Sequence, residues 1–231
     1  MPKRRSGREK MNSIHLNLVE VEPLTPNQVI AFESDKCLFL HGCAGTGKTF
    51  ISLYLAFRDV LTTDKYNQVE IIRSAVPTRE MGFLPGTDAE KARVYETPYI
   101  NISHELFDRG DAYELLKSKN LISFNTTSFI RGTTFNDSIV IVDECQNMTF
   151  HELDSIITRV GKNCKIIFCG DFFQSDLQKN SGISPFIDIV RNMNSFDFIE
   201  FGIEDIVRSD FVKHYLITKY NFRAWGQLSQ K

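Results

Sequence analysis

One glycine-rich stretch of the sequence has residue types and spacing that suit phosphate binding. Residues 42–49 read GCAGTGKT and match the pattern GxxxxGK[ST]. Glycines let the backbone curl so that several amides face one anion, and a following helix adds its positive dipole end. We expect Lys48 to reach the β- and γ-phosphates and the Thr49 hydroxyl to hold Mg²⁺. The expected nucleotide-binding residues are Gly42, Cys43, Ala44, Gly45, Thr46, Gly47, Lys48 and Thr49.

Two adjacent carboxylates provide a second, independent indication. The apolar run 139–142 ends in Asp143 and Glu144. We expect Asp143 to bind the Mg²⁺ shell through water and Glu144 to orient and deprotonate an attacking water. A kinase must keep water away from the γ-phosphate, so Glu144 favours hydrolysis over transfer. Taken alone, an Asp-Glu pair after a strand is equally well structural; the preceding phosphate loop favours the functional interpretation.

Two glutamines are further candidates for nucleotide contacts. Gln174 follows the apolar run 166–169, and its amide can donate to a γ-phosphate while it accepts from water; an exposed loop residue is the alternative. Gln28 ends the stretch TPNQ at 25–28 and can pair with both the amino group and N7 of adenine. For that stretch the alternative is a simple helix start with Pro26 in the first turn.

Short apolar runs alternate with helical patterns along the chain. Strands are predicted at 38–40, 69–72, 121–124, 139–142, 166–169 and 196–201. Several runs are apolar on both faces, which is typical of parallel strands covered by helices. Apolar residues within 51–57 predict a packed helix, and Thr149 with Glu152 predicts a capping box before a helix that Gly161 ends. This order indicates a doubly wound α/β sheet, which binds ligands at the carboxyl ends of its strands.

The length of 231 residues fits a single domain at 23–231 after a basic extension at 1–22. The segment 76–120 interrupts the alternation and is interpreted as an elaboration on one face of the sheet. No apolar run approaches the ~18 residues of a membrane span, so we expect a cytoplasmic protein without membrane contact. The net charge is −2, although Lys3, Arg4, Arg5, Arg8 and Lys10 make the first residues basic. That arm is able to touch nucleic acid or is simply solvated, and Met11 is a possible internal start.

The order of the motifs resembles that of the PhoH-like ATPases, from about residue 23 to residue 220. The stretches that carry the resemblance are TPNQ (25–28), GCAGTGKT (42–49), VPTREMGFLPG (76–86), FIRGTTF (129–135), DECQN (143–147), GDFFQ (170–174) and DIVRS (205–209). The part at 79–86 is the most specific to that family. The others also recur in the first motor domain of superfamily-1 helicases.

The resemblance implies a phosphate-loop NTPase of α/β class, with a RecA-like, doubly wound, mostly parallel sheet and helices on both faces. It also implies a helicase-like ATPase that uses ATP and Mg²⁺ and acts on RNA or single-stranded DNA. The family's usual DEAQ box reads Asp143-Glu144-Cys145-Gln146 here, a small-for-small change. Some relatives carry a PIN nuclease or KH-type domain for which this chain has no room. The compact form resembles phage-encoded versions.

A single motor domain lacks the arginine that a second domain supplies to the γ-phosphate in such helicases. We expect Arg208 to supply it across an interface between copies, which implies a homo-oligomeric ring, with a hexamer favoured. A surface salt bridge is the alternative role for Arg208. Candidate nucleic-acid contacts are Arg79, Arg131 and an aromatic side chain for base stacking, Phe83 or Tyr99. Arg131 is equally well suited to bind phosphate or to form a core salt bridge.

Two other functions use the same motifs. An ATP-gated switch that acts on a partner without unwinding needs every residue named above. A phosphate-loop kinase is disfavoured by Glu144 and Gln174, since both suit a reaction with water.

Overall fold

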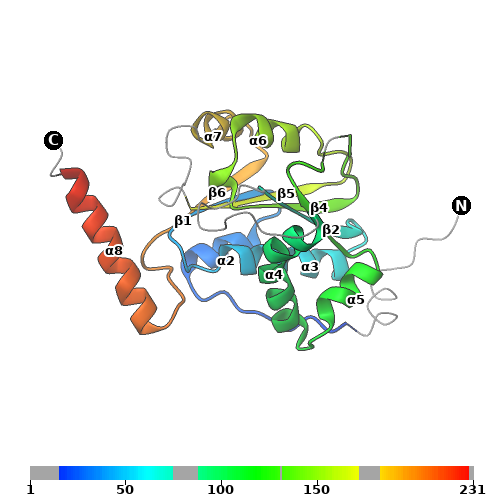
Figure 1. Cartoon of the computed structure of the whole chain (residues 1–231), viewed down its shortest axis with the longest axis horizontal. Coiled ribbons are helices and arrows are strands. Elements are labelled where there is room, and N and C mark those ends of the chain that lie inside the picture. Colours follow the sequence, from blue (N-terminus) through cyan, green and yellow to red (C-terminus); the bar gives the residue numbers. More distant parts are fainter. Residues whose placement is uncertain (1–15, 75–87, 131, 172–182, 229–231) are drawn as a thin grey trace, which may run out of the picture.

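The computed structural model of this chain describes residues 16–74, 88–130, 132–171 and 183–228, which form a sheet between two layers of helices (Figure 1). Within these ranges the sheet has six strands in the order β3-β2-β4-β5-β1-β6, and every pair is parallel. The strands are β1 (Cys37–Gly42), β2 (Gln68–Arg73), β3 (Ile122–Thr126), β4 (Ser138–Asp143), β5 (Lys165–Gly170) and β6 (Phe196–Phe201). All six predicted strands and the predicted α/β class are therefore confirmed.

Helices cover both faces of the sheet (Figure 1). On one face lie α2 (Pro26–Glu33), α3 (Lys48–Thr62), α4 (Asp88–Phe107) and α5 (Ala112–Ser118), and on the other lie α6 (Phe150–Ile157) and α7 (Ile183–Arg191). A short 3₁₀ turn, η1 (Cys145–Asn147), follows β4, and α8 (Asp210–Leu228) follows β6. Among the described residues, no helix has both the length and the apolar character needed to cross a bilayer.

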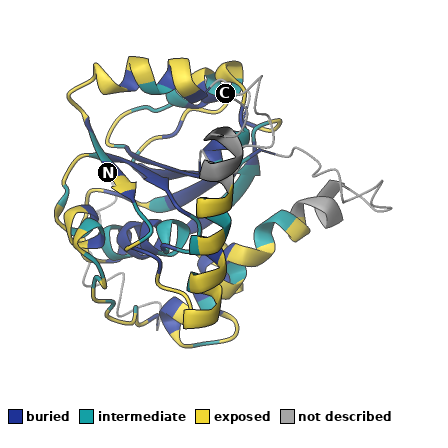
Figure 2. Ribbon diagram, turned by 90° about the vertical axis from the view of Figure 1, so that its left-hand side faces the viewer, coloured by how far each residue is buried: buried dark blue, intermediate teal, exposed yellow. Residues whose placement is uncertain are grey.

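Alternation along the strands divides the core between the two helical layers. Leu38 and Leu40 of β1 pack towards the layer that contains α3 and α4, whereas Phe39 packs towards α6 and α7. Figure 2 shows the resulting buried sheet, with exposed residues mainly on the helices and in loops. Because both faces are buried, the strands read as continuous apolar runs in the sequence.

Two helix starts follow from local sequence. The Thr25 hydroxyl accepts from the amide of Gln28 with Pro26 in the first turn of α2, and α6 has the predicted capping box between Thr149 and Glu152. The prediction that Gly161 ends α6 is wrong, because the helix ends at Ile157. Gly161 instead allows a close approach: a Cβ there would lie 2.5 Å from the carbonyl oxygen of Phe135.

Two segments contribute more to the core than the sequence indicated. Within the predicted basic extension at 1–22, Leu16 is fully buried and the Val19 amide donates to the Leu106 carbonyl at 2.8 Å, so residues 16–22 pack on the body. Within the predicted elaboration at 76–120, α4 and α5 form part of the layer beneath the sheet and bury Tyr99 and Tyr113. The apolar side chains of these segments explain their burial, since each removes apolar surface from water.

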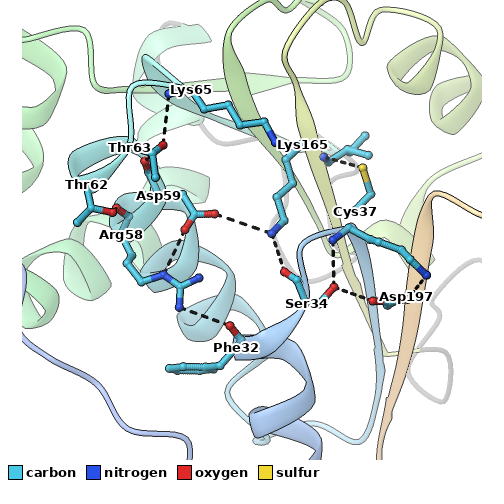
Figure 3. Close-up of polar contacts among 12 residues, drawn as sticks. Phe32, Ser34, Cys37, Arg58, Asp59, Thr62, Thr63, Lys65, Lys165 and Asp197 are labelled. Atoms are coloured by element: carbon cyan, nitrogen blue, oxygen red, sulfur yellow. Dashed lines mark hydrogen bonds and ion pairs between the residues drawn. The ribbon is translucent and has the colours of Figure 1, made fainter. Parts of the chain in front are cut away.

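A network of polar contacts joins several elements at the amino ends of β1 and β5, away from the phosphate loop (Figure 3). Lys165 is buried, and its Nζ donates to the Ser34 carbonyl at 3.1 Å and lies 3.8 Å from a carboxylate oxygen of Asp59. The Ser34 hydroxyl donates to Asp197 of β6 at 2.7 Å. Burial lowers the pKa of Lys165, and the charge of Asp59 opposes that effect. This network fixes α2 and α3 against the strands that carry the site.

Glu152 connects three elements, and its removal is expected to destabilise the fold. Its carboxylate accepts from Thr127 at 2.7 Å, from the Thr149 amide at 2.8 Å and more weakly from Ser74. Glu152→Ala should lower the free energy of unfolding at pH 7 by about 1–2 kcal/mol, measured by urea denaturation.

The pH dependence of that loss has a definite sign. Burial acts to raise the pKa of Glu152, but hydrogen bonds from Thr127 and Thr149 outweigh it and hold the pKa below 4.5. The stabilisation is therefore present above pH 4.5 and is lost as the pH falls through the lowered folded-state pKa. The difference between wild type and Glu152→Ala should shrink over that range. Glu105→Ala, at an exposed position of α4, is the control and should leave the free energy of unfolding nearly unchanged. An equal loss of unfolding free energy in both variants at pH 7 would contradict the expectation.

Candidate nucleotide-binding and hydrolysis site

The phosphate loop lies between the end of β1 and the start of α3, as the sequence predicts. Gly42, Gly45 and Gly47 all have positive φ, a conformation that side chains disfavour. Gly42 is required for a second reason, because a Cβ there would lie 2.1 Å from the carbonyl oxygen of Phe201 in β6. The loop therefore curls tightly beside β6 and leads into the amino end of α3, an arrangement that suits an anion.

Lys48 is folded back onto its own loop in this structure. Its Nζ donates to the carbonyl of Cys43 at 2.6 Å and to that of Gly42 at 3.1 Å. Burial lowers the pKa of Lys48, while the charges of Asp171, Glu144 and Asp143 oppose this effect. A cation beside three carboxylates at the carboxyl ends of strands is placed to receive phosphate oxygens.

Asp143, the last residue of β4, lies across the loop from Thr49. The Thr49 hydroxyl donates to Oδ1 of Asp143 at 3.0 Å, and the Tyr99 hydroxyl donates to Oδ2 at 2.9 Å. Burial and the neighbouring Glu144 charge raise the pKa of Asp143, against the hydrogen bonds of Tyr99 and Thr49 and the charge of Arg73. A hydroxyl and a carboxylate oxygen at one point are hard oxygen donors of the kind that Mg²⁺ selects, so the residues present fit this ion.

Glu144 follows Asp143 in a left-handed conformation with φ of 52°. Such backbone strain in a non-glycine residue is concentrated at functional sites. The Gln146 amide donates to Oε2 of Glu144, while its Oε1 accepts from the Asp171 amide at 3.1 Å. Gly170 makes room for this arrangement, since a Cβ there would lie 2.9 Å from Oε1 of Gln146. Gln146 thus holds Glu144 in relation to the end of β5.

Gln28 lies against the phosphate loop, and both ends of its amide have partners within the chain. Its Nε2 donates to the Thr46 carbonyl at 3.2 Å, and its Oε1 accepts from the Leu24 amide at 2.7 Å. The preceding Asn27 donates to Asp205 at 2.8 Å. The motif at 25–28 and the motif at 205–209, far apart in sequence, therefore meet beside the loop.

Arg208 is exposed and lies beside the loop of its own chain. Its Cγ would be 3.0 Å from a Cβ on Gly45, and the Val207 amide donates to the Gly45 carbonyl at 3.1 Å. The sequence placed this arginine at the phosphates of a neighbouring copy. The observed position puts it within reach of the loop in cis.

Some predicted site residues lie outside the described part of the chain, namely Arg79, Phe83, Arg131 and Gln174. The prediction that Tyr99 stacks on a base is wrong. Its side chain is fully buried, and burial, followed by the Asp143 charge, raises its pKa, so the phenol keeps its proton.

The structure adds Arg73, Gln146 and Tyr220 to the site. Arg73 ends β2 in register with Asp143, at the carboxyl ends of two neighbouring strands, and it directly follows the predicted strand at 69–72. Gln146 stands only two residues after Glu144 in the sequence, so its contact with Glu144 is a local one. The Tyr220 hydroxyl accepts from the Ala44 amide at 3.0 Å and lies 3.4 Å from Asp171, a long-range contact that no local pattern announces.

Comparison with known proteins agrees with these features. The family model described as "PhoH-like protein" matches residues 20–220. A PhoH-like protein of Mycobacterium leprae (strain TN) is 32% identical over 198 residues, which cover 83% of this chain and 56% of that protein. Protein PhoH of Escherichia coli (strain K12) is 33% identical over 183 residues, which cover 78% of this chain and 51% of that protein. The chain thus spans about half the length of these two relatives.

Among solved structures, the UvsW helicase from bacteriophage T4 aligns with a TM-score of 0.49 and 17% identity, over 85% of this chain and 66% of that one. The family match covers most of the chain and includes the phosphate loop, the Asp-Glu pair and Arg208. The chain belongs to the PhoH-like protein family.

Proposed function

We propose that this protein is a Mg²⁺-dependent ATP hydrolase. The observation that carries the proposal is the 3.0 Å hydrogen bond between Thr49 Oγ1 and Asp143 Oδ1. It joins the end of the phosphate loop to the carboxylate of a different strand at the point where Mg²⁺ binds in phosphate-loop enzymes.

Each residue of the site has a role that follows from its position. Thr49 and Asp143 would hold Mg²⁺, which neutralises charge on the phosphates when bound. Lys48 exchanges its carbonyl partners for phosphate oxygens, a stronger, charge-assisted interaction. The loop amides orient the phosphate chain so that its terminal group faces Glu144.

Glu144 acts on the attacking water. Its carboxylate accepts a proton from a water held in line with the terminal phosphorus, and Gln146 keeps one carboxylate oxygen fixed. Hydrolysis yields ADP and phosphate. Product analysis with γ-labelled ATP tests this step: label in inorganic phosphate only with Mg²⁺ supports it, whereas transfer to an acceptor or no turnover contradicts it.

Recognition of adenine by Gln28 is part of the proposal. Its amide would exchange the Leu24 and Thr46 partners for the adenine amino group and N7. Gln28→Ala should then reduce the preference for ATP over GTP in binding titrations. An unchanged preference would mean that Gln28 only supports the phosphate loop through its contact with Thr46.

We further propose that ATP turnover is coupled to RNA or single-stranded DNA. The motif order and family membership support this coupling. Turnover should rise when single-stranded RNA or DNA is added at low salt, because such binding is strongly salt-dependent. Directional strand displacement would distinguish a helicase from an ATP-gated switch. If the protein binds neither RNA nor single-stranded DNA, the proposed coupling is refuted and only the proposed ATPase activity remains.

A homo-oligomeric ring, with a hexamer favoured, is proposed on the condition that Arg208 acts across an interface. Its position beside Gly45 of the same chain supports a cis role instead. Mixing Arg208→Ala with Lys48→Ala decides between them. Recovery of ATPase activity in the mixture supports action in trans, and no recovery at any ratio, with assembly intact, assigns Arg208 a cis role or none.

A further inference from the structure

Tyr99 contacts the carboxylate of Asp143 from α4, a helix that lies outside the sequence motifs at 25–28, 42–49, 76–86, 129–135, 143–147, 170–174 and 205–209. Its hydroxyl donates to Oδ2 at 2.9 Å, while Thr49 donates to Oδ1 at 3.0 Å. We propose that Tyr99 is a positioning residue for Asp143, the residue that would hold Mg²⁺; this proposal rests on the function proposed above. By holding Oδ2, it keeps Oδ1 turned towards the Thr49 hydroxyl, where these two residues would hold Mg²⁺.

The arrangement leaves the Asp143 carboxylate little freedom. The terminal torsion of an aspartate is broad, so a single contact does not define where each oxygen points. Tyr99 itself is fixed, since it is fully buried and its ring packs on Phe124 with centroids 5.6 Å apart. Two hydroxyls on opposite oxygens, one from α3 and one from α4, therefore set the carboxylate plane.

Arg73 supports the same arrangement from β2. It pairs in register with Asp143, and its guanidinium lies 5.8 Å from the ring centroid of Tyr95 on α4. Its charge offsets the neighbouring carboxylates of Asp143 and Glu144. A cation from β2 and a phenol from α4 thus both act on the Asp143 carboxylate.

A matched pair of tyrosines tests this role. Tyr113 is also buried, and its hydroxyl donates to a carboxylate, that of Glu96 at 2.6 Å, away from Asp143. Calorimetric titration with ADP, with and without Mg²⁺, measures how much the ion strengthens binding. Tyr99→Phe should bind ADP alone as wild type does but lose about 10-fold of the Mg²⁺-dependent gain, as expected for one hydrogen bond to a charged group.

Tyr113→Phe should lose about as much folding stability as Tyr99→Phe, because each variant loses one buried hydrogen bond. It should keep the full Mg²⁺-dependent gain in ADP affinity. If Tyr99→Phe keeps the full Mg²⁺-dependent gain in ADP affinity, or if both variants lose this gain equally, the proposed role of Tyr99 is overturned. Should Tyr99→Phe fail to fold, a wild-type structure with Mg²⁺ and nucleotide decides: the Tyr99–Asp143 bond must persist. Wild type that ignores ADP altogether refutes the proposed function instead.

A second, independent observation concerns α8. This helix stands apart from both helical layers (Figure 1) and exposes Phe211, Tyr215 and Phe222. Its inward contacts include Leu216, which packs with Cys43 and Ile206, and Tyr220, whose hydroxyl accepts from the Ala44 amide.

The Tyr220 hydroxyl occupies one backbone amide of the phosphate loop, that of Ala44. Amides of such a loop bind nucleotide phosphates, and the phenol takes one of them at 3.0 Å. Burial raises the pKa of Tyr220 to about 12, so the group stays a neutral phenol. We infer that α8 is a nucleotide-sensitive latch, which rests on the proposed nucleotide site: entering phosphates take the Ala44 amide from Tyr220 and release the helix.

The chain provides its own reporter, since its single tryptophan, Trp225, belongs to α8. Titration with a non-hydrolysable ATP analogue should change the tryptophan emission of wild type. Tyr220→Phe removes the competing hydroxyl and should bind the analogue about 2- to 10-fold more tightly. Tyr215→Phe, at an exposed position of the same helix, should bind as wild type does.

Two results would overturn the latch. One is unchanged or weaker binding by Tyr220→Phe, and the other is an emission that does not respond to saturating analogue. Failure of wild type and both variants to bind the analogue would refute the nucleotide site itself.

Discussion

Glu144→Gln is expected to abolish ATP hydrolysis while ATP binding is retained. The amide keeps the size and the contact with Gln146 but cannot accept a proton from water. Loss of a general base costs about 10²- to 10⁴-fold in rate. Steady-state turnover and equilibrium binding of ATP, measured on the same preparation, check both halves of the expectation.

Glu105→Gln is the matched control, because Glu105 is an exposed glutamate of α4. It should leave turnover unchanged. Turnover of Glu144→Gln within a few-fold of wild type would show that another group activates the water. Loss of binding together with turnover would assign Glu144 to the nucleotide rather than to the reaction.

Lys48→Ala is expected to have the second large effect, on affinity. The Lys48 side chain is half-buried beside the loop, and alanine leaves no cation to meet the phosphates. Charge-assisted hydrogen bonds contribute about 1.5–3 kcal/mol each, so ATP should bind roughly 10- to 100-fold more weakly. Isothermal titration at fixed Mg²⁺ measures the loss.

Stability of this variant should not fall. Burial penalises the charged amine in the free protein, and its present partners are two loop carbonyls and, at the longer distance of 3.4 Å, the Thr46 hydroxyl. Lys119→Ala, at an exposed lysine, is the control for charge. Equal ATP affinity in Lys48→Ala and wild type would remove Lys48 from the site.

The sheet and the phosphate loop were predictable because their signals are local. Strands buried on both faces appear as apolar runs, and the loop needs glycines where φ is positive. The meeting of Thr49 with Asp143 followed from one rule, that carboxyl ends of parallel strands share an edge.

The remaining site residues depend on packing between distant segments. Tyr99 belongs to the predicted elaboration at 76–120, and only the docking of α4 beneath the sheet brings its hydroxyl to Asp143. Tyr220 reaches Ala44 across 176 positions of sequence. Arg208 was predicted near phosphates, but its placement against Gly45 of its own chain required knowledge of where the 205–209 turn lies.

A crystal structure with Mg²⁺ and a non-hydrolysable ATP analogue tests the central claim most directly. The phosphates should lie on the amides of residues 44–49, with Mg²⁺ about 2.1 Å from Thr49 Oγ1 and Asp143 beside it. A nucleotide bound elsewhere, or a metal ion that contacts neither Thr49 nor the shell around Asp143, would contradict the account.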